Sequence, residues 1–226
     1  MSRALEKARA EAARAAADVE KWVRAVTGAA GELAAAEATE VTDPSQLDSV
    51  GDAAVRARGK VGAAQRALDT AETRRSVARR AVLLAEAADE DDEAARVERD
   101  VRAHESKVQN LLDQLRDLDG VPYDAVTAES TYSDRRRFGG SGDGQVFQAR
   151  RLDLLVASAR QHRVRAAVLR STAATGGVPT FNHEVDYTFP DWHAGTPLTG
   201  DDVPDSARDY AASLTPEPTA EDVATG

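Results

Sequence analysis

Residues 97–118 read VERDVRAHESKVQNLLDQLRDL, and this stretch decides the fold of the chain. Its apolar residues and one histidine recur at alternating spacings of four and three, at Val97, Val101, His104, Val108, Leu111, Leu115 and Leu118. In an α-helix this spacing places the side chains in one narrow stripe. The stretch therefore predicts a helix with a coiled-coil seam.

The N-terminal part of the chain repeats the same pattern twice. A first seam has Trp22 as its one large aromatic side chain and comprises Leu5, Ala8, Ala12, Ala15, Val19, Trp22, Val26, Ala29, Leu33 and Ala36. A second seam comprises Val61, Ala64, Leu68, Ala71, Arg75, Ala78, Val82 and Ala85. These seams predict two further helical stretches, since heptad spacing sustained over several turns is typical of packed helices.

The connections between the seams carry their own signals. Residues 43–46, Asp-Pro-Ser-Gln, indicate a helix start with Asp as the N-cap and Pro at the first helical position. The helix that begins there is expected to run antiparallel to the first. Across the acidic run 89–93 the seam slips by two residues, so the chain either turns there or continues as a stuttering or kinked helix. The absence of Gly and Pro favours the continuous helix, and a three-helix arrangement is the alternative.

Beyond residue 120 the composition changes, because nearly all aromatic residues and prolines lie there. A fourth helical seam includes Leu155 and His162, near alternation of residues 178–193 is consistent with a short strand, and 204–214 predicts a short helix with Tyr210 inward. We expect a mainly α fold, a long antiparallel coiled coil or bundle of three or four helices with an irregular C-terminal arm. Its segments are Ala-rich coiled-coil helices over 1–118, a Gly-rich connector over 119–144, a basic helix over 145–174, an aromatic-containing arm over 175–214 and an acidic tail over 215–226.

The apolar composition favours association with other helices. Alanine supplies the largest share of the apolar residues and isoleucine is absent, so leucine and valine provide most of the large aliphatic surface. Alanine favours helix but buries little area. The seams named above, chiefly Trp22, Leu68, Val82, Leu155, His162 and the 97–118 stripe, are therefore expected to pack within the chain or against another chain.

The charge is unevenly distributed along the chain. There are 29 Lys and Arg against 39 Asp and Glu, for a net charge of −10, yet residues 145–174 are strongly basic and 175–226 strongly acidic. Either these two regions attract each other within one chain, or the basic side contacts an external polyanion. For the second case the candidate residues are Arg135, Arg136, Arg137, Arg150, Arg151, Arg160, Arg163 and Arg165, together with Arg170.

No local motif indicates catalysis, a cofactor or a metal ion. The chain has no cysteine and no G-x-S-x-G elbow, and its glycine cluster at 139–144 lacks the Walker lysine. The acidic run 89–93 lacks the spacing of an EF-hand loop. The set His183, Glu184, Asp186, Asp191 and His193 matches no known ligand spacing. We therefore expect a non-enzymatic protein with no catalytic, cofactor or metal site.

The sequence thus favours a structural or assembly protein whose partners are copies of itself or subunits of a larger assembly, such as a virion. The alternative is a nucleic-acid-binding accessory protein that uses the basic helix 145–174. No signal peptide or apolar span is evident, so we expect a soluble protein made in the cytoplasm, without a membrane partner, that could be incorporated into a particle.

Overall fold

The computed structural model describes residues 2–40, 42–119, 123–126, 145–148, 150–181 and 197–214. Within these ranges the protein is mostly helical, as the sequence predicts. The chain divides into two compact units, Met1–Ala85 and Glu86–Gly226. We describe each unit separately, although one long helix contributes to both.

The first unit is a pair of helices joined by a capped turn. Helix α1 spans Arg3–Glu37, and helix α2 spans Leu47–Asp119 after a 3-10 turn, η1, at Pro44–Gln46. The Asp43 carboxylate accepts the backbone N–H of Ser45 at 2.8 Å, so the predicted cap is confirmed. This hydrogen bond also lowers the pKa of the Asp43 carboxyl.

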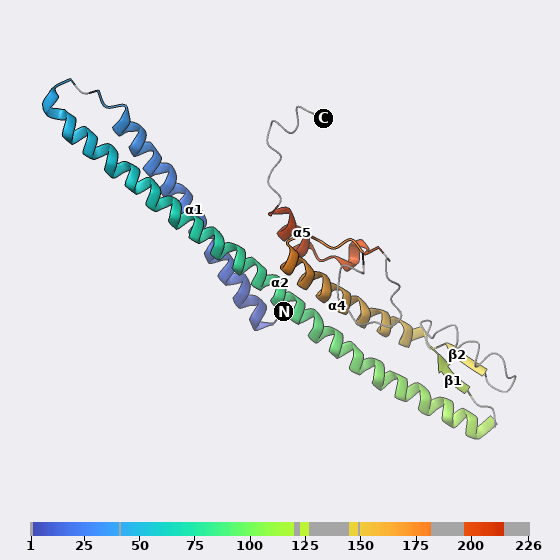
Figure 1. The fold of residues 1–226 in the computed structure, drawn as a ribbon. Coiled ribbons are helices and arrows are strands. Elements are labelled where there is room, and N and C mark those ends of the chain that lie inside the picture. Colours follow the sequence, from blue (N-terminus) through green and yellow to red (C-terminus); the bar gives the residue numbers. More distant parts are fainter. Residues whose placement is uncertain are drawn as a thin grey trace, which may run out of the picture. The chain divides into compact units, whose positions relative to one another are not determined.

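The two helices of the first unit run antiparallel. Arg58 Nη2 lies 2.7 Å from Glu37 Oε1, and Lys60 Nζ lies 2.6 Å from Glu32 Oε2. The later residue on α2 thus pairs with the earlier residue on α1, as two antiparallel helices require. Figure 1 shows α1, in blue, lying beside the first half of α2.

The contact between these helices has small side chains on the α2 side and a mixture of small and larger ones on the α1 side. Every position of the predicted first seam is buried or half-buried, and Leu5, Val19 and Ala29 are the most buried. On α2 the buried residues recur every seven positions, at Ala57, Ala64, Ala71 and Ala78. The helix pair is therefore held by narrow alanine contacts that remove little apolar surface from water.

Helix α2 passes through the acidic run 89–93 without interruption. The continuous helix predicted from the lack of Gly and Pro is confirmed, and a turn at this point is excluded. The phase slip is also seen in the burial pattern of α2. Ala71 and Ala78 are buried seven residues apart, and the next such pair is Ala87 and Ala94, which is shifted by two residues. Leu83, not the predicted Val82, is the large residue most buried near the slip.

The described part of the second unit contains the rest of α2, a pair of strands and the helices α4 and α5. Strands β1 (Tyr123–Val126) and β2 (Gln145–Gln148) pair in parallel, with Tyr123 opposite Gln145. The sequence predicted a connector and the first turn of a helix in these places. Periodicity cannot reveal a four-residue strand whose partner lies far away along the chain, so this pairing was missed.

Helix α4 (Arg150–Thr175) therefore begins later than predicted, and it ends where the sequence indicates. Gly176 follows with a φ of 81°, and its N–H donates to the Thr172 carbonyl at 2.9 Å. This left-handed conformation is the usual end of a helix, and glycine adopts it without a Cβ penalty.

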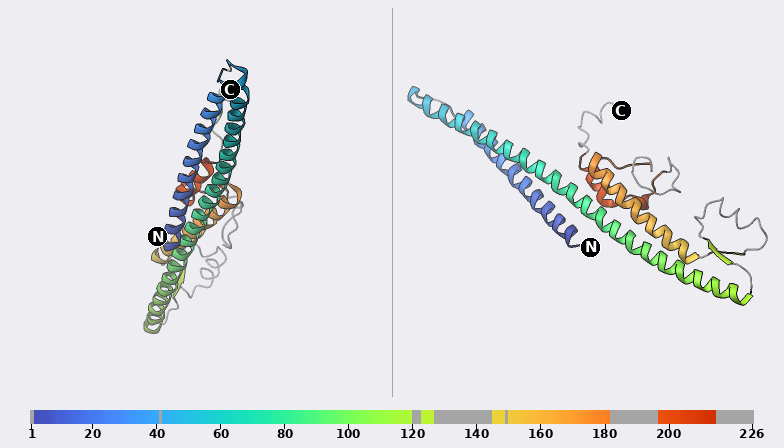
Figure 2. Two further views of the ribbon diagram at one scale, coloured as in Figure 1. Left: turned by 90° about the vertical axis from the view of Figure 1, so that its left-hand side faces the viewer. Right: turned by 60° about the horizontal axis from the view of Figure 1, so that its bottom comes forward.

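Helix α4 forms the centre of the second unit. Val164, Ala166, Val168 and Leu169 are buried almost completely. Helix α5 (Asp205–Ala212) and the 3-10 turn η3 (Gly200–Asp202) lie against α4, with Tyr210 buried as predicted. Figure 2 shows α4 beside the second half of α2 and α5 near the C-terminal end of α4.

The predicted strand over 178–193 is described only in its first residues. Phe181 forms a single antiparallel bridge with Pro197, and residues 178–180 are not in a strand. The remainder of that prediction lies outside the described residues, as do the acidic tail 215–226 and Arg135–Arg137.

We expect Leu169→Ala to lower the free energy of unfolding of the second unit by about 2–5 kcal/mol, because it leaves a cavity in a fully buried position. The matched control is Leu154→Ala on the same helix, where the side chain is exposed and the change should stay within about 0.5 kcal/mol. Urea unfolding followed by circular dichroism measures both. Equal effects of the two variants would contradict the assignment of α4 as the core.

Candidate functional site

Acidic side chains of α2 and basic side chains of α4 meet within the second unit. We call this group the ion-pair cluster, and its members are Glu90, Asp91 and Glu98 on α2 and His162, Arg163, Arg165 and Arg170 on α4. All four basic residues come from the part of α4 that carries the buried core. The cluster therefore lies along the edge of the α2–α4 contact.

Glu90 is the most enclosed acid of the cluster. Its side chain is 13% exposed, and its two oxygens lie 2.6 Å from His162 Nδ1 and 3.2 Å from Arg165 Nη2. Arg165 Nε is buried and has no hydrogen-bond partner in the described structure, so Glu90 is the main compensation for the Arg165 charge.

Arg163 links two turns of α2. Its Nε and Nη2 donate to the two oxygens of Glu98 at 3.0 and 3.1 Å, while Nη1 donates to Asp91 Oδ1 at 3.0 Å. The other oxygen of Asp91 pairs with Arg170. A two-pronged guanidinium contact of this kind requires a defined geometry, so it fixes the position of α4 along α2.

The local sequence explains why these groups meet. Glu90, Asp91 and Glu98 lie close in sequence to the buried positions Ala87, Ala94 and Val97 of α2. On α4 the basic residues lie between or next to buried positions of the core, which include Val164, Ala166 and Leu169. Burial of the alanine and valine faces thus brings the charged borders together, and their opposite signs stabilise the contact.

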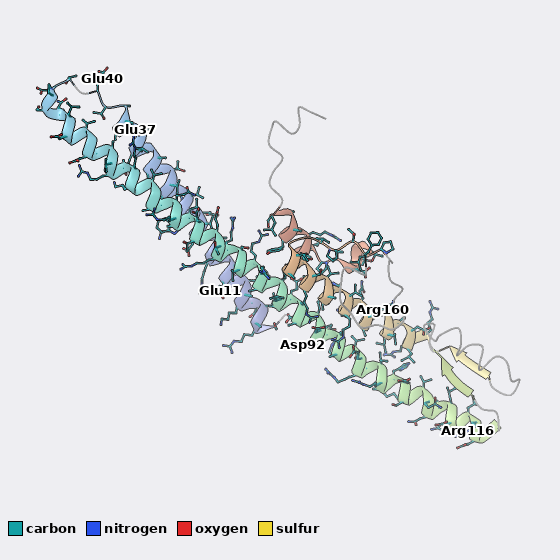
Figure 3. All side chains as sticks on the ribbon, in the orientation of Figure 1. Glu11, Glu37, Glu40, Asp92, Arg116 and Arg160 are labelled. Atoms are coloured by element: carbon teal, nitrogen blue, oxygen red, sulfur yellow. The ribbon has the colours of Figure 1, made fainter. Side chains whose placement is uncertain are left out.

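Asp92 and Glu93 of the acidic run are not members of the cluster. Asp92 is exposed (Figure 3), and Glu93 pairs with Arg96 on its own helix. The Arg96 hydrogen bond lowers the pKa of the Glu93 carboxyl. Among the described residues no group of His, Cys, Asp and Glu is arranged to hold a metal ion. The predicted candidate set at 183–193 lies outside these residues.

The basic helix thus meets an acidic partner that the sequence did not single out. We expected α4 to face either the acidic C-terminal region or an external polyanion. Helix α5 and η3 of the C-terminal region do lie against α4, and α2 in addition supplies the carboxylates for Arg163, Arg165 and Arg170. Arg150 and Arg151 are exposed, and Arg160 is half-buried on the same helix (Figure 3). The acidic run itself was the available signal, and it could have been matched to α4 by opposite charge.

The predicted seam residues are distributed between buried and exposed positions. Val97 is buried, and those that are half-buried are Trp22, Leu68, Val82, Val101, His104, Val108, Leu155 and His162. Leu111, Leu115 and Leu118 are exposed, while the neighbouring Leu112, which the spacing did not select, is buried. Trp22 also has Lys21 Nζ 5.6 Å from its ring centroid. The 97–118 stripe is thus buried or half-buried from Val97 to Val108 and exposed from Leu111 to Leu118.

His104 borders a groove of about 520 Å³ between α2 and α4. Asp100, Lys107 and Val108 line it from α2, with Arg151 and Leu155 from α4. The groove therefore has both polar and apolar walls.

Comparisons with family models, with curated proteins and with solved structures find no match for this chain. Within the described part of the chain, no helix combines the length and apolar character needed to cross a bilayer.

We expect Glu90→Gln to lower the free energy of unfolding of the second unit by about 1–3 kcal/mol, because it leaves the partly buried Arg165 guanidinium without its carboxylate. The matched control is Glu93→Gln, which removes an exposed pair within one helix and should leave the unfolding midpoint unchanged. Urea unfolding at neutral pH compares them. An unchanged midpoint in Glu90→Gln would contradict a stabilising role for the cluster.

Proposed function

We propose that this protein is a non-enzymatic structural or assembly component. Its helices join it to copies of itself or to the subunits of a larger complex, of which a virion is one example. One observation carries this proposal, namely the open stripe of leucines near the end of α2. The stripe consists of Leu111, Leu115 and Leu118.

The leucine stripe leaves large apolar side chains in water. Leu111 is 64%, Leu115 41% and Leu118 87% exposed, and their spacing puts them on one face of the helix. Full burial of one leucine contributes about 1.5–3 kcal/mol. Three leucines on one helical face therefore offer a substantial gain to an apolar helix face of a partner.

The heptad spacing supports a coiled coil as the form of contact. Ala64, Ala71 and Ala78 are buried at seven-residue intervals, and the seam of α1 follows the same rhythm. Supercoiled helices with such repeats serve as rods and connectors because their contacts extend along the helix axis. We infer that the helices of this chain connect and brace, and that no substrate site is built on them.

Nucleic-acid binding has less support from the described residues. Arg163, Arg165 and Arg170 are used in the ion-pair cluster, which leaves fewer cations for phosphates. Arg150 and Arg151 are exposed at the start of α4. A phosphate contact through so few arginines would give only a shallow dependence of affinity on salt.

We expect a variant with serine in place of Leu111, Leu115 and Leu118 to form smaller particles than the unaltered chain, because the apolar contact is lost. These positions are exposed, so helix content should be retained. Light scattering coupled to size exclusion measures the mass, and circular dichroism measures the helix content.

The matched control is Leu154→Ser, which alters an exposed leucine on α4 outside the stripe and should leave the particle mass unchanged. An unaltered chain that is monomeric under all conditions, without a stoichiometric partner, would refute the proposed function.

A further inference from the structure

A groove of about 470 Å³ runs between α1 and α2 in the first unit. Its lining consists of apolar residues, of exposed charged residues at its edges, and of Thr73. The apolar residues are Ala15, Ala71, Val77, Ala78 and Ala81, and the charged residues are Glu11, Arg14, Asp18 and Arg74.

The apolar part of the groove continues along α2 as an uncovered stripe. Val77, Ala81 and Leu84 follow each other at spacings of four and three, and Val77 and Leu84 are 62% and 49% exposed. Alanines form most of the α2 side of the contact with α1, and the larger apolar side chains Val77 and Leu84 of α2 remain outside it. A third and a fourth helix would be needed to cover them.

The charged edges of the groove have no partners in the described structure. Glu11 on α1 (Figure 3), Arg14, Asp18 and Arg74 make no ion pair there, although Glu32 and Glu37 of the same helix pair across to α2. Both signs are present on one surface. Such a surface is self-complementary, since each sign can meet the opposite one on a second copy.

The register of the helix pair shows which charges would meet. Asp18 lies two heptads before Glu32 on α1, and Arg74 lies two heptads after Lys60, the partner of Glu32, on α2. Asp18 and Arg74 therefore stand at the same level on opposite edges of the groove. A two-fold axis parallel to the helices would bring Asp18 of one copy opposite Arg74 of the other, and the reciprocal pair would form at once.

We propose that this groove binds the same groove of a second copy of the chain, giving an antiparallel four-helix bundle with α1 of each copy against α2 of the other. The inference rests on the proposed function and adds the face that mediates self-association. Up-and-down bundles of two helical hairpins bury the apolar sides of all four helices. The Asp18–Arg74 pairs set the alignment of the two copies.

A charge exchange tests the contact directly. Asp18→Arg and Arg74→Glu are each introduced into the chain that already has serine at Leu111, Leu115 and Leu118, so that the leucine stripe contributes nothing. The parent chain is expected to be a dimer by mass. Each charge variant alone should be a monomer, because like charges then face each other at both of the contacts between positions 18 and 74.

Mixing the two charge variants should restore a particle of two chains in a 1:1 ratio, because each facing pair then joins one basic and one acidic side chain again. Light scattering gives the mass, and a tag on one variant gives the ratio. Restoration by mixing cannot result from misfolding, and circular dichroism checks that each variant alone remains helical.

The control pair is Glu20→Arg and Arg24→Glu, which makes the same charge changes on the exposed face of α1 away from the groove, and both variants should remain dimeric. If the serine-substituted parent chain is a monomer while the wild type forms a larger particle, the groove contact is overturned and the proposed function stands. Charge variants that stay dimeric would also overturn the groove contact. A wild type that is monomeric and has no stoichiometric partner would overturn both.

Discussion

Alanine at the helix contacts limits how much apolar surface this chain can bury by itself. Ala57, Ala64, Ala71 and Ala78 are the buried positions of α2 in the first unit, and Ala87 and Ala94 are buried farther along α2 in a shifted phase. Alanine stabilises each helix through its propensity but adds little on burial. The helices are thus well determined while their larger apolar residues, among them Val77, Leu84 and Leu111, stay in water.

The second unit compensates for this limit in two ways. Helix α4 contributes larger buried residues such as Val168 and Leu169, and the ion-pair cluster fixes its register on α2. Partly enclosed ion pairs add specificity of alignment more than net stability. The long helix α2 therefore serves as a common surface, with a different set of buried positions for each partner helix.

The helical elements could be predicted from the sequence because they depend on local spacing and capping. The seam of α1, the Asp43 cap, the continuity of α2 and the end of α4 near Gly176 all follow from short-range rules.

The β1–β2 pairing could not be predicted, since it joins residues far apart in the chain. The pairing of Glu90 and Asp91 with α4 was not predicted either, because it too joins residues far apart in the chain. Exposure of Leu111 beside buried Leu112 depends on the exact rotation of α2, which heptad spacing defines only to within one residue.

Completion of the apolar helix faces by another chain would couple folding to association. The melting temperature must then rise with protein concentration, because mass action favours the assembled state. Thermal unfolding followed by circular dichroism over a wide range of concentrations measures this directly. We expect a melting temperature that increases steadily with concentration, and a melting temperature independent of concentration would contradict the role of a second chain.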